Sequence, residues 1–331
     1  MSNIVRILYL SYSLLVLFPL CALAQEQEQI SEKKGEAIIQ VFTNFHTGFG
    51  SVNDERGFEL DRSYLGYQYK LAEGLNIKAI IDFGQSRKVD DFHHIAYIKN
   101  AQLSWKKKNF SVCGGLISTT QFNLQEKFWG YRYIMKSFQD KYRFGSSADL
   151  GISVSYKFLP FLSADAIVCN GEGYKKIQVK NGLEYGLGVT LTPIKNLIIR
   201  LYANVNETSD NTYSNIWNYA GFIGYKNNCF SLGAEYNYMQ NQNHIKNADC
   251  SGLSIYSSVN IGNHTSIIAR YDNLYSRKDW NINKDEQAIL LGAHFDVHKY
   301  VKLAPNVRVI MPKASGAKTE CYAFLNCYFG I

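Results

Sequence analysis

Residues 58–83 read FELDRSYLGYQYKLAEGLNIKAIIDF, and the alternation of side chains within them decides the fold class. Apolar or aromatic residues occupy every second position on both sides of a Glu73-Gly74 turn: Leu65, Tyr67, Tyr69 and Leu71 before it, and Leu75, Ile77, Ala79, Ile81 and Phe83 after it. Polar residues such as Gln68 and Lys78 stand between them. Successive side chains of a strand point to opposite faces, so the stretch predicts a hairpin with one apolar face.

The same alternation recurs along the chain. Further segments of this kind lie at 36–46, 94–105, 110–118, 148–158, 161–170, 182–192, 197–206, 215–225, 230–240, 252–261, 265–275, 286–297, 300–310 and 320–331. Tight turns such as Leu159-Pro160 and His298-Lys299 alternate with longer polar loops, as in outer-membrane barrels. We therefore predict an all-β fold, a transmembrane antiparallel β-barrel of about sixteen strands. A soluble β-sandwich, the alternative, has strands of about 5 or 6 residues and no such alternation of connector length.

The first residues predict a secretory signal peptide. A basic start ending at Arg6 precedes an apolar stretch over residues 7–20, shorter than the roughly 20 residues of a membrane helix. Ala22-Leu23-Ala24 has the form of a cleavage site. Lipidation at Cys21 is the alternative, but Leu20 stands where that processing requires a small residue. We predict a signal peptide at 1–24, a flexible periplasmic leader at 25–35 and a barrel at 36–331, in the outer membrane of a Gram-negative cell.

Charge and cysteine usage exclude several classes of function. The chain has 35 Lys and Arg against 28 Asp and Glu, and these residues are dispersed, which argues against a nucleic-acid partner. No Cys-x-x-Cys occurs, and His93-His94 would point to opposite faces of a strand, so we predict no metal site and no cofactor. The cysteines beyond Cys21 lack paired short spacing, and we expect most of them to be unpaired.

The long segment from 119 to 145, the third long loop, interrupts the strand pattern. It interleaves aromatic residues with basic ones, and residues 125–139 have the apolar period of a short helix. We expect this loop to fold into the lumen, where its cations would lower the electrostatic barrier for anions. The alternative is a loop packed over the barrel mouth with its basic groups solvated or paired. The candidates for the pore constriction are Lys127, Arg132, Lys136, Lys141 and Arg143.

Charged residues on the polar faces of the strands extend the candidate site to the barrel wall. The lumen-wall candidates are Arg62, Lys78, Asp82, Glu184, Arg200, Glu235, Arg270 and Arg308. A barrel of sixteen strands is wide enough for an aqueous channel, so we expect these groups to stay hydrated and to tune selectivity. On the opposite, lipid-facing side we expect Tyr67, Tyr69, Trp105, Trp217 and Tyr219 near the membrane interfaces.

Several short motifs resemble a known family. They are FELDRSYLGY at 58–67, YIKNA at 97–101, SADLG at 147–151, ARYD at 269–272 and LAPN at 303–306. These motifs are similar to those of the phosphate-selective porins O and P and their wider superfamily. The resemblance implies a sixteen-stranded pore that assembles as a homotrimer. Those porins use a dense series of arginines and a lysine cluster, which this sequence does not reproduce residue by residue. The resemblance therefore does not imply phosphate selectivity, and phosphate is only a candidate solute.

The sequence therefore predicts an outer-membrane porin. Its partners would be membrane lipid and small hydrophilic solutes, and a preference for phosphate or other small anions is the finer hypothesis. An adhesion or binding role of the loops and an outer-membrane hydrolase are the alternatives. No Gly-x-Ser-x-Gly or His-Glu-x-x-His motif occurs, and His294 alone among the histidines has lumen-facing parity within a strand. We therefore predict no catalytic residues and no enzymatic activity.

Overall fold

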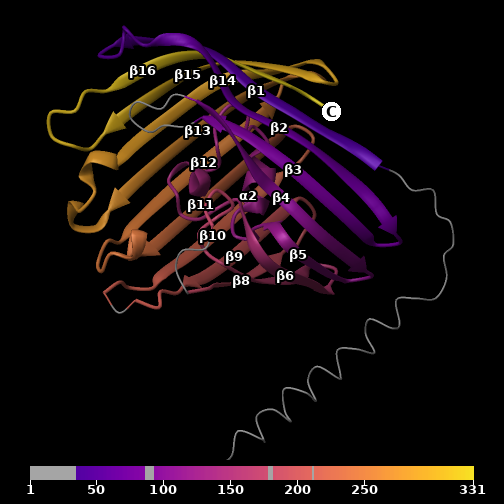
Figure 1. The fold of residues 1–331 in the computed structure, drawn as a ribbon. Helices are drawn as coiled ribbons and strands as arrows, with labels where there is room; N and C mark the ends of the chain where they lie inside the picture. The colour runs from indigo at the N-terminus through magenta and orange to yellow at the C-terminus, as the bar shows by residue number, and fades with distance from the viewer. Residues whose placement is uncertain (1–34, 86–92, 178–181, 211) are drawn as a thin grey trace, which may run out of the picture. The chain divides into compact units, whose positions relative to one another are not determined.

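The computed structural model describes residues 35–85, 93–177, 182–210 and 212–331. Within these ranges the chain forms sixteen strands in one closed antiparallel barrel (Figure 1). Each strand pairs with its neighbours in sequence, and the first pairs with the last: Gln40 lies opposite Gly330 and Gly50 opposite Glu320. Closure leaves no open strand edge. A sheet that spans a lipid bilayer must be closed in this way, because unpaired backbone groups have no water to bond there.

The strands follow one another around the barrel in chain order. They are β1 (Gly35–Gly50), β2 (Arg56–Ala72), β3 (Leu75–Gln85), β4 (His94–Lys107), β5 (Phe110–Ser118), β6 (Ala148–Leu159), β7 (Leu162–Cys169), β8 (Glu184–Leu191), β9 (Leu197–Asn206), β10 (Ile216–Lys226), β11 (Phe230–Gln240), β12 (Cys250–Asn260), β13 (Thr265–Ser276), β14 (Glu286–His298), β15 (Val301–Pro312) and β16 (Glu320–Gly330). Each predicted segment corresponds to one of these strands, so the predicted fold class is confirmed.

The connectors give the two ends of the barrel different characters. At one end, the short-turn end, they are 73–74, 108–109, 160–161, 192–196, 227–229, 261–264 and 299–300. At the other, the long-loop end, they extend from 51–55 up to 119–147 and include the short helices η1 (Gln242–His244), η2 (Arg277–Asp279) and η3 (Ile282–Lys284). No helix among the described residues is long and apolar enough to cross a membrane.

The two faces of the strands differ as the sequence predicts. On β2, Leu65 and Tyr67 are exposed on the outside, whereas Arg62 and Tyr64 are buried inside. Outward-facing Trp105, Trp217 and Tyr219 are also exposed, and Tyr69 is half-buried. The exposed outer surface is built largely from apolar side chains, while charged groups gather in the lumen. The six cysteines of the described strands and turns are free thiols.

A β-bulge in β4 changes which residues face the lumen. Ile80 pairs with Asn100, but the next residue, Ile81, pairs with Ile98, so Lys99 has no partner on β3. Ile98 is 60% exposed on the outside and Asn100 is 1% exposed on the inside. The extra residue of a bulge re-aims the side chains around it. Lys99 and Asn100 therefore both face the lumen, although they are consecutive.

The long segment between β5 and β6 folds into the barrel. It carries α2 (Asn123–Trp129), drawn within the ring of strands in Figure 1, and α3 (Phe138–Lys141). The predicted helix over 125–139 is wrong. Gly130 takes a left-handed conformation with φ 74° and ends α2, and the carbonyls of residues that follow it are bonded to side chains of the barrel wall.

Aromatic side chains seat this loop against the wall. The ring of Phe128 lies 5.2 Å from that of Phe222 on β10 and 6.2 Å from that of Tyr256 on β12, measured between centroids. Phe138 is fully buried against Gly252, where an added Cβ would lie 1.9 Å from the ring. The absence of a side chain at Gly252 thus permits the close approach of the loop to β12.

Candidate functional site

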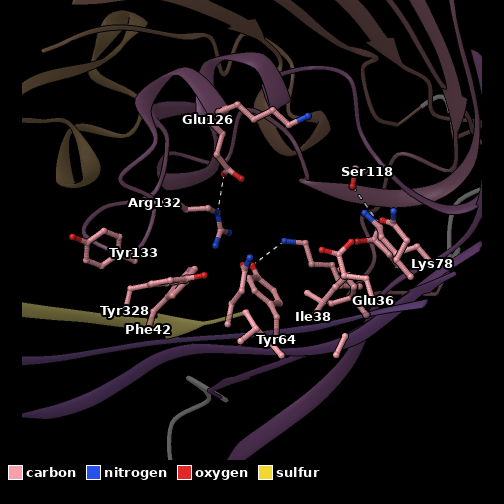
Figure 2. Close-up of a pocket in the computed structure, with 18 of the residues that line it drawn as sticks. Glu36, Ile38, Phe42, Tyr64, Lys78, Ser118, Glu126, Arg132, Tyr133 and Tyr328 are labelled. Atoms are coloured by element: carbon pink, nitrogen blue, oxygen red, sulfur yellow. Dashed lines mark hydrogen bonds and ion pairs between the residues drawn. The ribbon is translucent and has the colours of Figure 1, made fainter. Parts of the chain in front are cut away.

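One cavity lies between the loop and the short-turn end of the barrel, and we call it the short-turn cavity. Its volume is about 610 Å³, and strands β1 to β5, β15 and β16 contribute to its lining. Figure 2 shows Lys78, Tyr64 and Arg132 around it, with Glu126 above Arg132. Its basic side chains are Lys78, Lys99, Lys127, Arg132 and Lys302, and its acidic ones are Glu36 and Glu126.

A second cavity of about 530 Å³, the long-loop cavity, lies on the other side of the loop. It is bordered by the ends of the strands at the long-loop end and by residues 171–176. Its basic side chains are Arg62, Lys136, Arg143, Lys175 and Lys176, and its acidic ones are Asp140, Glu172 and Glu184. Basic groups thus outnumber acidic groups on both sides of the loop.

Tyr64 and its neighbours separate the two cavities, and we call this part of the lumen the narrow region. Arg132 borders the short-turn cavity, while its Nη2 donates to Oδ2 of Asp140, on the border of the long-loop cavity, at 3.0 Å. The Tyr64 ring lies 5.8 Å from the guanidinium carbon of Arg132, 5.8 Å from that of Arg62 and 4.4 Å from Nζ of Lys99. Three cations therefore converge on one phenol ring.

Both guanidinium groups of the narrow region are paired with carboxylates. Arg132 donates from Nε to Glu126 at 2.8 Å as well as to Asp140, and Arg62 donates to Asp82 at 2.6 Å. Burial disfavours the charge of Arg132, but Tyr64 and the two carboxylates outweigh it and hold the pKa of Arg132 above its ordinary value. The loop arginine therefore stays charged within a compensated cluster.

Burial by itself would raise the pKa of Asp140. The charges of Arg132 and Lys136 oppose this effect and lower the pKa of Asp140 below its ordinary value. For Lys136, partial desolvation within the lumen is the largest cause and lowers the pKa, although the side chain is still exposed to the long-loop cavity. The carboxylate of Asp140 is thus held ionised where the loop meets the narrow region.

The structure places the five predicted constriction residues in four different surroundings. Arg132 reaches the narrow region. Lys127 is exposed in the short-turn cavity, and Lys136 and Arg143 are exposed in the long-loop cavity. Lys141 borders neither cavity, because its Nζ is bound to Tyr142 at 2.7 Å and to Glu286 at 2.9 Å.

Three of the predicted wall arginines hold the loop instead of lining open space. Arg200 donates from Nη2 to the carbonyl of Thr120 at 2.7 Å. Arg308 donates to the carbonyl of Ile134 at 2.7 Å, and Arg270 to that of Lys136 at 2.8 Å. These carbonyls lie where the loop backbone lacks regular hydrogen bonding, so they need side-chain donors.

The expectation that the wall charges stay hydrated is wrong for most of them. Each charged side chain of the wall that is buried has a polar or charged partner. Arg200 is bound to Asp165 at 2.6 Å and Arg270 to Asp272 at 2.8 Å. The buried wall charges are Arg62, Asp82, Glu184, Arg200, Glu235 and Arg270. The loop and the neighbouring side chains bury these groups, which the sequence pattern could not show.

The remaining wall candidates have different surroundings. Asn204 donates to Glu184 at 2.8 Å, and Asn237 donates to Glu235 at 3.1 Å. Glu184 borders the long-loop cavity, whereas Glu235 is 2% exposed. Lys78 is half-buried and borders the short-turn cavity. Lys78 is thus the predicted wall residue that borders the short-turn cavity.

Sequence reasoning missed four lysines of the site, Lys99, Lys175, Lys176 and Lys302. Lys99 lies in the narrow region and donates from Nζ to the hydroxyl of Tyr64 at 2.8 Å. Lys175 stands over the ring of Tyr97 at 5.0 Å, in a loop without regular structure. Strand parity placed Lys99 outside the lumen, and the bulge that overturns it has no sequence signature here. The motif at 97–101, which contains Lys99, was the only available signal.

Among the described residues, no group of three or more His, Cys, Asp or Glu side chains is placed to hold a metal ion. His294 is buried and bonded to Tyr133 and Asp296.

Comparison with known proteins shows the fold. No protein-family model matches the sequence, and none of the curated proteins matches it. Among solved structures, the anion-selective porin from Comamonas acidovorans is 13% identical, covering 91% of this chain and 100% of that one, with a TM-score of 0.65. OprB of Pseudomonas putida is 11% identical, covering 90% and 94%, with a TM-score of 0.68. OmpF of Salmonella typhi, in complex with daunomycin, is 10% identical, covering 90% and 98%, with a TM-score of 0.66.

The fold is therefore that of the outer-membrane porins. The likeness extends to porins of several kinds, and at these identities it shows the fold. The narrower resemblance to the phosphate-selective porins O and P remains a prediction.

Proposed function

We propose that this protein is a passive channel of the outer membrane that admits small hydrophilic solutes and prefers anions. The porin-type barrel supports the class of function, and the apolar outer surface fits contact with membrane lipid. The predicted signal peptide, cleaved near Ala24, fits export across the inner membrane of a Gram-negative cell. In this orientation the short-turn end faces the periplasm and the long-loop end faces outward.

The excess of basic side chains in both cavities carries the anion preference. A solute that crosses the lumen would pass from the long-loop cavity to the short-turn cavity through the narrow region. A cleft lined by one sign of charge raises the local concentration of the opposite ion. Because Arg62 and Arg132 are paired, the uncompensated cations along this route are mainly the lysines, with Lys99 beside Tyr64.

The route follows one side of the barrel. Aromatic side chains of the loop pack against β10 and β12 through Phe222 and Tyr256, and against β11 to β13 through Met239, Cys250 and Leu274. The loop thus occupies much of the lumen beside β10 to β13. The short-turn cavity instead borders β1 to β5, β15 and β16, so the wall charges in contact with solute there are Glu36, Lys78, Lys99 and Lys302.

The solute itself is proposed only as a class. The cations are distributed over both cavities and face acidic groups at intervals, which fits a moderate preference for small anions, phosphate among them. A homotrimer is the assembly that the family resemblance implies. Cross-linking of the protein in detergent, followed by electrophoresis without heating, tests that assembly.

Planar-bilayer recording tests the function. In a salt gradient, the refolded protein should give stable conductance steps with a reversal potential of the sign set by anions. A potential set by cations would contradict the anion preference, and folded protein without conductance would contradict the channel.

A further inference from the structure

The tip of the inserted loop is tied to the barrel wall by a histidine. The hydroxyl of Tyr133 lies 2.7 Å from Nδ1 of His294 on β14. On the far side of the imidazole, Nε2 lies 3.2 Å from Oδ1 of Asp296, and Asp296 is 3.7 Å from Nζ of Lys302. Tyr133, His294 and Asp296 thus form one chain of hydrogen bonds from loop to wall.

The hydrogen-bond partners determine which nitrogen of neutral His294 carries the proton. An ionised carboxylate can only accept a hydrogen bond, so Nε2 carries the proton and donates to Asp296. The other nitrogen, Nδ1, then has a free lone pair and accepts the hydrogen bond that the Tyr133 hydroxyl donates. The tie between loop and wall therefore requires the neutral imidazole in this tautomer.

His294 is enclosed by the loop and three neighbouring strands. The loop presents Tyr131, whose ring centroid is 5.2 Å from the imidazole, and Tyr133. Asp296 on its own strand and Lys302 on β15 are the charged groups that face it, and on β13 its cross-strand partner is Ser266. Tyr328 on β16 packs against Tyr133.

Protons can reach the imidazole from the short-turn end. His294, Asp296 and Lys302 border a cavity of about 300 Å³ whose lining includes the turn residues Asn227, Gly262 and Asn263. The side chain of His294 is nevertheless buried, as is that of Tyr133. A change of protonation at His294 would therefore act on a buried hydrogen bond between the loop and the barrel wall.

We propose that His294 is a positioning residue that holds the tip of the constriction loop, and that protonation of its imidazole loosens the tip. The consequence for conduction rests on the proposed channel function. Protonated His294 has donors on both nitrogens. The Tyr133 hydroxyl can then only accept a hydrogen bond from Nδ1. Its own proton loses its acceptor, and a buried donor is left without a hydrogen bond.

Other contacts limit the movement to the tip. Asn326 donates to the carbonyl of Tyr133 at 3.3 Å, and Arg308 donates to that of Ile134. Neither bond involves a group that titrates near neutral pH. Loosening would thus change the local order of residues 131–135 without releasing the whole loop.

Hydrogen–deuterium exchange of the folded protein tests the tie directly. Wild type and His294→Gln are compared at the same pH, so that the intrinsic pH dependence of exchange cancels. Glutamine can accept from Tyr133 and donate to Asp296 but does not titrate. At pH 8 the two should exchange alike over 131–135, and at pH 5 the wild type should exchange faster, by about tenfold for loss of one buried hydrogen bond.

Two further variants sharpen the test. Tyr133→Phe removes the donor. At pH 8, residues 131–135 of this variant should therefore exchange faster than those of the wild type, by the same factor that separates the wild type from His294→Gln at pH 5. His298→Gln, at the exposed end of the same strand, should behave as the wild type at both pH values. Equal exchange of wild type and His294→Gln at pH 5 would overturn the proposal.

Conductance at both pH values separates this proposal from the proposed function. The wild type should show a pH-dependent change of single-channel current or noise that His294→Gln lacks. A tip that loosens in acid without any current at either pH would support the tie and refute the channel. Currents with the same pH dependence in both proteins would refute the tie and leave the channel standing.

Discussion

The Nζ atom of Lys99 lies 2.8 Å from the hydroxyl of Tyr64 and has no carboxylate partner among the described residues, whereas Arg62 and Arg132, on the same ring, are both paired. Lys99 therefore supplies the uncompensated positive charge of the narrow region. We predict that Lys99→Gln lowers the ratio of anion to cation permeability more than any single substitution at the loop lysines.

The measurement for Lys99 is the reversal potential in a salt gradient. Lys195→Gln, in the turn at 192–196 and outside both cavities, is the control that removes an equal charge. An unchanged reversal potential in Lys99→Gln would show that the lysine lies off the path of the ions.

Arg270 joins the loop to the wall through two partners. It donates to the carbonyl of Lys136 and pairs with the fully buried Asp272. Arg270→Gln removes the hydrogen-bonded counter-charge of a buried carboxylate and leaves it with Lys141, whose Nζ is 3.9 Å away. Breaking a buried pair typically costs about 3 to 5 kcal/mol, and the remaining lysine should place the loss at the lower end of that range. We expect lower resistance to urea unfolding and noisier open-channel current. Equal unfolding midpoints for the variant and the wild type would refute the anchoring role.

Gly252 accommodates the ring of Phe138. Gly252→Ala should displace the loop and lower the unfolding free energy by about 1 to 3 kcal/mol, as overpacking does. The substitution Phe138→Ala removes the ring that the new methyl group meets. In a double-mutant cycle the two changes together should cost less than their sum. Additive effects would mean that the two positions do not compete for space.

Asp140 makes the stability of the folded protein depend on pH in a different way from His294. Its pKa is lower in the folded protein than its ordinary value of about 3.9, so its contribution to stability is present above that value and is lost as pH falls through the folded pKa. Asp140→Asn should be less stable than the wild type at pH 7. The difference should shrink below about pH 4. A difference that is constant with pH would show that Arg132 does not depend on this carboxylate.

Strand alternation predicts the barrel well because it is a local property. On β2, Arg62 and Leu65 fall on opposite faces of the sheet, and one parity rule assigns both. The rule fails at Lys99, where one extra residue shifts the register and no glycine or proline marks the bulge. Parity therefore identified most of the lumen wall but missed the lysine that contacts Tyr64.

Contacts of the loop depend on distant parts of the chain and could not be predicted. Nothing near Arg200 in sequence indicates that it donates to the carbonyl of Thr120, which is 80 positions away. The period of residues 125–139 reflects aromatic packing against the wall, and Gly130 divides it. Predicted hydration of Arg200 and Arg270 was wrong for the same reason, since the loop covers them.

The central claim is that the lumen conducts and prefers anions. The most direct test is the reversal potential of the refolded protein in a planar bilayer with a potassium chloride gradient, at neutral pH. We predict stable conductance and a potential of the sign that chloride sets. A potential of the sign that potassium sets, or folded protein that passes no current, would contradict it.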